Sequence, residues 1–255
     1  MKQYFPDLAR LTAFLTLSLG LWGCGVTRTV PMQVDYPADS VASAVDIDSY
    51  GGIVRVIADP LAKGIGVESS VHVPRWVDPH EVKTIIAAAD VTAEVVEDDN
   101  HHTILRVKGS TAYPDDTASD LYITVRMPSV EGTRVQLVRG DTELVNVAGA
   151  IQVSQVQGNI TLRTSKPLTD PVLLVTGKGN INAAIDPGST GVLDLSSHSG
   201  RVTCRVREGV TRDVSAGYSF FRGILNQGSN PVKMEAVGNV LLNIRSDAGS
   251  LIRPR

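Results

Sequence analysis

The segment Ser196–Gly200, with the sequence Ser-Ser-His-Ser-Gly, places hydroxyl nucleophiles beside a possible base, His198. A serine nucleophile of the Gly-x-Ser-x-Gly type needs a strand–turn–helix setting and an acidic residue that orients the histidine. The segment has neither, and it falls where a glycine-marked turn is expected. We therefore predict a turn, assign no catalytic residue and do not expect an enzyme.

Metal ligands are the second chemistry to consider. His101 and His102 follow Asp98 and Asp99, and imidazole together with carboxylate suits zinc or copper. Adjacent side chains of an extended chain point to opposite sides, however, and no third ligand motif is evident. A polar hairpin loop is expected instead. The sequence predicts no metal site and no cofactor.

Four arginines are concentrated in one short stretch of the C-terminal part. Guanidinium groups bind carboxylate, sulfate or phosphate in a bidentate manner. If neighbouring strands carry these side chains outward, they form a strip for an anionic polysaccharide or for lipid headgroups; the alternative is an ordinary solvated strand face. The candidate binding residues are Arg201, Arg205, Arg207 and Arg212.

Residues 1–23 have the three-part order of an export signal. Lys2 and Arg10 precede an apolar run from Leu11 to Trp22. This run is shorter than the about 20 apolar residues that cross a bilayer as a helix, and polar residues follow it at once. We therefore expect the segment to be removed during export.

The junction Leu21-Trp22-Gly23-Cys24 resembles the lipobox of bacterial lipoproteins, whose cysteine sulfur receives a diacylglyceryl group before cleavage. Trp22 departs from that pattern, which usually has a small residue there. The resemblance implies that Cys24 is lipidated and that several acyl chains anchor the protein stably in a membrane. It implies a cell-envelope location, with the outer membrane or the cell surface as the destination because Gly25 follows the cysteine.

The exported part has few means of stabilisation other than packing. Removing residues 1–23 leaves 22 basic and 26 acidic residues and a formal charge of −4, so nucleic acid is not an expected partner. Cys204 is then the only unmodified thiol, which excludes an internal disulfide. Cys204 itself occupies an inward repeat position and is expected to be a small buried side chain.

A tether is expected over residues 24–43, and a β-rich region over 44–130. In this region Asp78-Pro79-His80-Glu81 has the pattern of a helix start, with Asp as the N-cap and Pro at the first helical position. A short helix is therefore predicted over 79–90, between strands that begin near Val45 and end near Pro128.

Residues 131–255 are repetitive. Gly140, Gly149 and Gly158 are nine residues apart, and Gly191, Gly200 and Gly209 repeat the spacing in another register. Aliphatic residues stand two and four places after many glycines, so each unit is a glycine turn followed by a short strand. Stacked units of this kind predict a mainly β, solenoid or β-helix-like body; an antiparallel β-sandwich is the alternative.

A calcium-binding β-roll is not expected from these repeats, because its unit carries a carboxylate at the sixth place. Val145, Ser154 and Arg163 stand there. Arg139-Gly140-Asp141, a tripeptide that some integrins bind, is in phase with the repeat and is interpreted as chance. The aromatic cluster of Tyr218, Phe220 and Phe221 is expected to cap the core, or else to form a contact for a sugar or a protein.

Taken together, the lipobox, the strand at Tyr50–Ile53, the helix-containing insert, the strand Asp120–Val125 and the Gly-x-Ile/Val/Leu repeats resemble the bacterial putative adhesin families with a β-helical, DUF4097-like domain. The resemblance covers about residues 45–252. It implies an envelope-associated binding or structural module and carries over no catalytic residues.

The first functional hypothesis is accordingly a lipid-anchored, non-enzymatic envelope protein that binds an envelope protein or an anionic polysaccharide, or that acts in envelope sensing. The second is a polysaccharide-active enzyme, because some β-helices cleave acidic glycans. The third is a purely structural envelope module.

Overall fold

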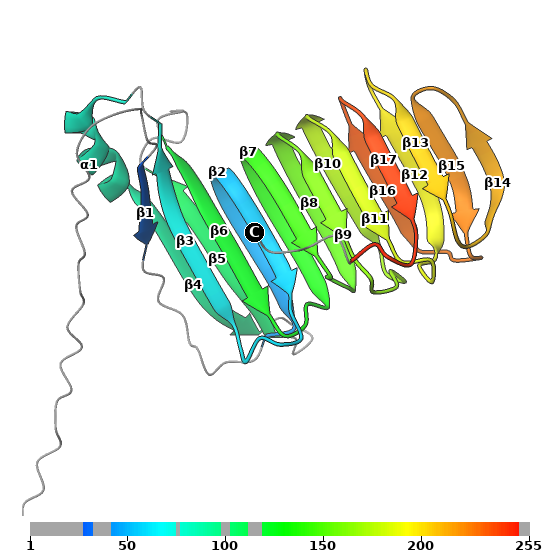
Figure 1. Ribbon diagram of the computed structural model, residues 1–255, viewed down its shortest axis with the longest axis horizontal. Coiled ribbons are helices and arrows are strands. Elements are labelled where there is room, and N and C mark those ends of the chain that lie inside the picture. Colours follow the sequence, from blue (N-terminus) through cyan, green and yellow to red (C-terminus); the bar gives the residue numbers. More distant parts are fainter. Residues whose placement is uncertain (1–27, 33–41, 75–76, 98–102, 112–118, 250–255) are drawn as a thin grey trace, which may run out of the picture.

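The computed structural model describes residues 28–32, 42–74, 77–97, 103–111 and 119–249. Within these ranges the protein is mainly β with one helix, α1, which confirms the predicted class (Figure 1). Residues 1–23, which are expected to be an export signal, Cys24 and the His101-His102 pair lie outside the described residues, so the expectations for them remain predictions.

The elements follow one another in two groups. The first group is β1 (Arg28–Met32), β2 (Ala44–Ala58), β3 (Gly66–Val73), α1 (Pro79–Ala88), β4 (Ala89–Glu97), β5 (Thr103–Thr111), β6 (Asp120–Met127) and β7 (Gly132–Val145). The second group is β8 (Ala150–Gln157), β9 (Ile160–Arg163), β10 (Val172–Lys178), β11 (Ile181–Ile185), β12 (Gly191–Ser197), β13 (Val202–Val206), β14 (Thr211–Ala216), β15 (Phe220–Leu225), β16 (Pro231–Ala236) and β17 (Val240–Ile244).

Two long strands, β2 and β7, connect two parallel sheets. Their first halves pair with each other and with β5 and β8, and the ladder continues through β10, β16 and β12. Their second halves pair with β6 and β9, and that ladder continues through β11, β17 and β13. We call these the first and the second sheet. Antiparallel pairing is confined to their ends, so an antiparallel sandwich does not describe the body.

Between the sheets lies one core of mostly aliphatic side chains, and buried and outward residues alternate along strands such as β3, β8 and β16. In the first sheet, for example, an inward row of consecutive ladder partners runs through Val45, Thr133, Ile151, Val172, Val232 and Leu193. Each fully buried aliphatic side chain contributes about 1.5–3 kcal/mol. Because this row includes β2, the ladder crosses residue 130 without a break, and the regions 44–130 and 131–255 share one core.

A column of glycines forms the corner between the sheets, where the chain passes from one to the other. At Gly52, Gly140, Gly158 and Gly179 the φ angle is positive. A Cβ atom on Gly158 would lie 1.9 Å from the carbonyl oxygen of Gly140, and one on Gly179 would lie 1.8 Å from that of Gly158. Any side chain at this corner would therefore overlap the backbone of the neighbouring turn.

The residues after the corner glycines form a hydrogen-bonded ladder. Asp141 Oδ1 accepts from the Asn159 backbone N–H at 2.7 Å, and Asn159 Oδ1 accepts from the Asn180 N–H at 3.1 Å. Asn180 Oδ1 accepts from the Asn239 N–H at 2.8 Å, and Asn239 Oδ1 from the Arg201 N–H at 2.9 Å. Each turn thus fixes the next one, and backbone donors that would otherwise be unpaired are satisfied.

The order of this ladder also reveals the topology. Asn239 stands between Asn180 and Arg201 because the last strands of the chain, β16 and β17, lie between β10–β11 and β12–β13. The nine-residue spacing predicted successive stacking along the sequence. The structure differs, since the C-terminal pair inserts itself into the ladder and β12–β13 become the last turn.

At the other end of the ladder, Asp78 caps α1 as expected, accepting from the His80 N–H at 2.8 Å. The helix ends at Ala88, two residues before the predicted boundary, because Ala89 is already extended and starts β4. Val82 and Ile85 form its buried face. A second difference concerns the tether expected over 24–43, since Arg28–Met32 forms β1, which pairs antiparallel with β3.

Replacing Gly158 by alanine tests the corner. We expect Gly158→Ala to lower the free energy of unfolding by at least about 2 kcal/mol, because the new methyl group meets the Gly140 carbonyl in a strained φ region. Urea unfolding followed by circular dichroism measures the change. Gly66→Ala in β3 is the matched control, since its Cβ atom would have only ordinary contacts, the nearest at 3.7 Å. Equal stability of the Gly158 and Gly66 variants would contradict the corner constraint.

Candidate binding surface

The predicted turn at Ser196–Gly200 is a hydrogen-bonded corner. Ser197 is buried; its hydroxyl donates to the Gly238 carbonyl at 2.7 Å and accepts from the Gly200 N–H at 2.7 Å. Ser199 donates to the Val237 carbonyl at 2.8 Å, and His198 is exposed. These two hydroxyls hold the corner, which gives them a structural role. The absence of catalysis remains a prediction.

The arginine strip is only partly assembled. Arg205 is exposed on β13, and Arg201 and Arg207 are exposed directly before and after this strand, whereas Arg212 lies on β14, which is paired through β15 to the first sheet. The repeat pattern predicted that all four lie on neighbouring units. In the structure, β14 instead forms a hairpin with β15 and belongs to the other sheet. Among the described residues, none of the four guanidinium groups forms an ion pair with a carboxylate.

The aromatic cluster is divided between the core and the surface, so the expected core cap is met by one ring and the contact role remains a prediction. Phe221 is half-buried and packs against the core, while Tyr218 is 67% exposed and Phe220 40% exposed. The guanidinium carbon of Arg201 lies 5.2 Å from the centre of the Tyr218 ring, within the range of a cation–π contact. The aromatic rings therefore border the same end of the ladder as β13.

Arg139 and Asp141 of the Arg-Gly-Asp tripeptide line a hollow of about 430 Å³ at the glycine corner. Arg139 Nη2 donates to the Ser119 carbonyl at 2.7 Å, and its Nε lies 3.4 Å from Asp120. Asp141 is engaged by Asn159. Both charged groups are thus held by neighbouring turns, which supports the interpretation of the tripeptide as a structural coincidence.

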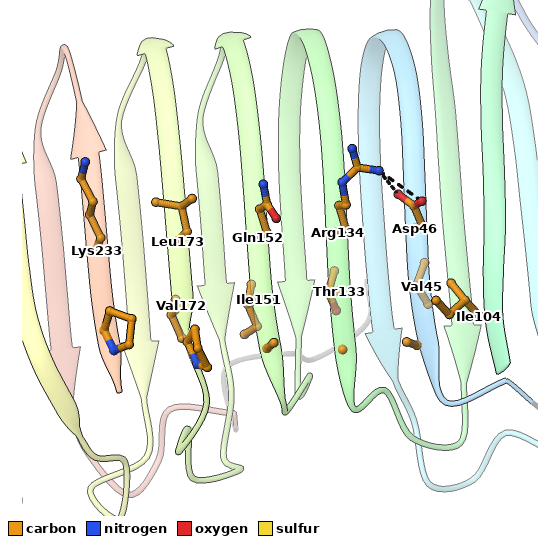
Figure 2. Close-up of a pocket in the computed structure, with 15 residues that line it drawn as sticks. Val45, Asp46, Ile104, Thr133, Arg134, Ile151, Gln152, Val172, Leu173 and Lys233 are labelled. Carbon is orange, nitrogen blue, oxygen red and sulfur yellow. Dashed lines mark hydrogen bonds and ion pairs between the residues drawn. The ribbon is translucent and has the colours of Figure 1, made fainter. Parts of the chain in front are cut away.

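A shallow groove of about 550 Å³ crosses the start of five strands on the outer face of the first sheet (Figure 2). Its floor is a row of small or ring-shaped residues that point away from the core. They are Ala44, Gly132, Ala150, Pro171 and Pro231, each of which directly precedes one of the consecutive ladder partners Val45, Thr133, Ile151, Val172 and Val232. Five strands at the spacing of about 4.8 Å give the row a length of roughly 19 Å. Because these side chains are small, the floor lies below the neighbouring outward residues. The prolines have no backbone N–H group to donate.

The rim of the groove is the next outward row, and it carries charges and longer side chains. Figure 2 shows Asp46, Arg134, Gln152, Leu173 and Lys233 along this row. Arg134 Nη1 contacts both carboxylate oxygens of Asp46, at 3.0 and 3.2 Å. A hydrogen bond and ion pair with Glu235 at 3.0 Å raise the pKa of Lys233 above its ordinary value. The surface therefore combines an apolar floor with a fixed polar border.

Neither the glycine spacing nor the pattern of inward residues indicates this groove. The sequence does contain a pattern that marks the groove floor. Each floor residue directly precedes the first inward residue of its strand, and the five positions hold Ala, Gly, Ala, Pro and Pro.

Cys204, predicted to be a buried side chain, is half-buried near the end of the core. Burial raises the pKa of its thiol from 9.0 to about 11. The reactive species of a cysteine is the thiolate, so this thiol is poorly reactive near neutral pH.

We therefore expect alkylation of native Cys204 at pH 8 to be about a hundredfold slower than that of the unfolded chain, because two pKa units separate the thiolate fractions. Maleimide labelling in a Cys24→Ser background, where Cys204 is the only thiol, measures this. Because folding raises the pKa of Cys204, its protonated thiol favours the folded state. This contribution to the free energy of unfolding is fully present below pH 9 and is lost as the pH rises through 11. Native labelling as fast as labelling in urea would contradict the burial.

The described part of the chain has neither a metal-ligand cluster nor a membrane-spanning helix. Its side chains include no group of three or more histidine, cysteine or acidic residues that could hold a metal ion. None of its helices has the length and hydropathy needed to span a membrane.

The sequence matches no family model and no curated protein. Solved structures do align with the chain. The crystal structure of a putative cell adhesion protein from Clostridium sporogenes aligns over 86% of this chain and all of that chain, with a TM-score of 0.55 and 10% identity. That of a putative adhesin from Bacteroides fragilis aligns over 89% of this chain and all of that chain, with a TM-score of 0.36 and 14% identity.

The fold therefore defines the class as a mainly β protein whose architecture is shared with the Clostridium sporogenes structure. This conclusion rests on the Clostridium sporogenes structure, because of these two structures it alone has a TM-score above 0.5. At 10% identity the likeness concerns the fold alone.

Proposed function

We propose that this protein is a lipid-anchored, non-enzymatic binding protein of the cell envelope, with the groove on the outer face of the first sheet as its contact surface. The observation that carries the proposal is this groove, which has an apolar floor across five parallel strands and a charged rim. The body is then a two-sheet β-solenoid that holds the surface rigidly. The parallel ladders and repeated glycine corners support this description.

An extended segment of a partner protein is the occupant that the groove fits best. The lining residues are aliphatic, proline or small, with polar groups on one side, and include no aromatic ring. Sugar-binding surfaces commonly use aromatic rings as apolar platforms, whereas aliphatic side chains of a polypeptide pack well on a floor of this kind. Gln152 and the Asp46–Arg134 pair can orient such a segment.

The position of the proposed anchor supports display at a surface. Cys24 precedes the first residue of β1 by four positions, a reach of at most about 14 Å. The second sheet has β1 at one end and β13 at the other, separated by eight strand spacings or roughly 38 Å. Lipidation of Cys24 would therefore hold the β1 end near the membrane and leave the β13 end free to point away from it.

Filling the groove tests the proposed contact. Ala150 is exposed and lies on the groove floor, so we expect Ala150→Trp to reduce binding of the protein to intact cells or isolated envelopes at least about tenfold, since a bulky ring replaces the contact surface. Ser154→Trp is the matched control, because Ser154 is exposed on the outward face of the same strand and lies outside the groove lining. Binding curves of labelled protein, with thermal unfolding as a check on folding, provide the comparison.

Equal binding of the Ala150 and Ser154 variants would overturn the groove as the contact. Loss of binding after glycosidase treatment of the envelopes, with no loss after protease treatment, would replace the protein partner by a polysaccharide. Turnover of an acidic polysaccharide by the purified protein would reject the non-enzymatic assignment.

The anchor has its own test. In a bacterial host, we expect the wild-type chain to incorporate an alkyne-labelled fatty acid and to sediment with membranes. We expect Cys24→Ser to do neither, because serine lacks the sulfur atom that would receive the diacylglyceryl group. Trp22→Ala, which restores a small residue in the lipobox, should be processed at least as completely as wild type. Unchanged fatty-acid labelling of the Cys24→Ser variant would refute the assignment.

A further inference from the structure

The end of the second sheet has an open strand edge. β13 pairs with β17 in parallel, and β17 is the only strand of the described structure that is paired with it. The Val240 N–H donates to the Arg201 carbonyl at 3.0 Å, and the Arg207 N–H donates to the Ile244 carbonyl at 3.1 Å. In a regular parallel ladder, alternate residues direct both peptide groups to the same neighbour. The odd-numbered residues of β13 therefore bond to β17.

The even-numbered residues consequently direct their N–H and C=O groups to the opposite side. There the Val202 N–H donates to the Tyr218 carbonyl at 2.9 Å. Beyond this bond, the peptide groups of Cys204 and Val206 face a side where no strand of the described residues pairs with them. These two residues offer donors and acceptors at the spacing that one further strand requires.

The two faces of this edge differ in chemistry. On the inward face, Cys204, Val206 and Phe221 are half-buried, so the core is incompletely covered at this end. On the outward face are Arg201, Arg205 and Arg207, which have no carboxylate partner among the described residues. Arg201 lies over Tyr218, whereas Arg205 and Arg207, which are two residues or about 7 Å apart along an extended chain, have no partner of opposite charge within the part of the chain that the structure describes.

We propose that the β13 edge binds an extended acidic segment of a partner protein by strand addition. Its backbone pairs with Cys204 and Val206, alternate aliphatic side chains cover the half-buried end of the core, and the acidic side chains between them contact Arg205 and Arg207. Opposite charges on directly paired residues stabilise a sheet, and like charges destabilise it. A second copy of β13 would bring arginines together, so charge complementarity selects an acidic partner over self-pairing.

This site is separate from the groove, which lies on the first sheet. The probe is a fluorescent peptide in which valine and glutamate alternate, added to the full-length protein in detergent at low ionic strength. Control peptides have lysine at each glutamate position, or the same composition with all glutamates in one block. Fluorescence anisotropy should show saturable binding of the alternating acidic peptide and at least tenfold weaker binding of both controls.

Substitutions at the edge then test the geometry. Val206→Pro removes a peptide donor that faces away from β17 and leaves the β13–β17 bonds intact, so we expect at least about tenfold weaker binding. Val206→Ala, which keeps that donor, is the matched control and should bind within about threefold of wild type, since only part of an apolar contact is lost. The pair Arg205→Glu with Arg207→Glu should weaken binding at least about tenfold, and Arg212→Glu on β14 should not.

Several results would overturn the proposal. These are absence of saturable binding, equal effects of Val206→Pro and Val206→Ala, or an Arg212→Glu effect as large as that of the β13 pair. Loss of peptide binding in Ala150→Trp would place the peptide in the groove instead. Self-association of the protein that Val206→Pro abolishes, measured by light scattering, would assign the edge to a second copy.

Discussion

The fold depends on one close approach, that of the backbone to itself at the glycine corner. A carbonyl oxygen of each turn occupies the space that a Cβ atom of the next turn would fill, as Gly140 does for Gly158 and Gly158 for Gly179. This approach brings the turns to the spacing of a hydrogen-bonded sheet, because no side chain separates them. It also turns the chain sharply enough that one strand can serve both sheets, as β2 and β7 do.

The polar residues near this corner follow from the same constraint. A sharp turn leaves backbone groups outside the regular ladder, and the residues after the glycines pair them from turn to turn through the asparagine ladder. On the inner side, Thr176 donates to the Gly158 carbonyl at 2.8 Å, and Gln155 links Thr142 with Thr176. These buried groups are tolerated because each is paired. The outward faces of the sheets carry no comparable requirement, so their side chains are free to form binding surfaces.

Much of the body was predictable because it depends on local patterns. Alternation identified the inward residues, glycine spacing identified the turns, and Asp78-Pro79 identified the start of α1. The pairing order was not predictable from spacing, since any unit with the same inward residues can stack on any other. A weaker signal did exist. Asparagine follows Gly158, Gly179 and Gly238, whereas Arg201 follows Gly200, as expected if Gly200 belongs to the last turn.

The candidate surfaces were harder to predict, because they depend on which strands become neighbours. The groove floor combines residues from 44 to 231, and no periodicity in the sequence connects them. The four arginines were identified by composition, yet the hairpin of β14 and β15 separates Arg212 from the others. Sequence patterns thus specify the core positions, and topology decides which outward residues meet.

The two strand edges at the far end of the ladder differ in a way that bears on their use. In β14 the pairing register shifts between Arg212 and Ser215, and Asp213 has a φ of 51°, so a bulge interrupts the regular row of peptide groups. Bulges of this kind protect edges from unwanted pairing. β13 has no such interruption and stays in register with β17 from Val202 to Val206. The same end of the molecule therefore has one edge that is blocked by its backbone and one edge whose backbone is regular. At the second edge selectivity rests on charge, which repels a basic strand and admits an acidic one.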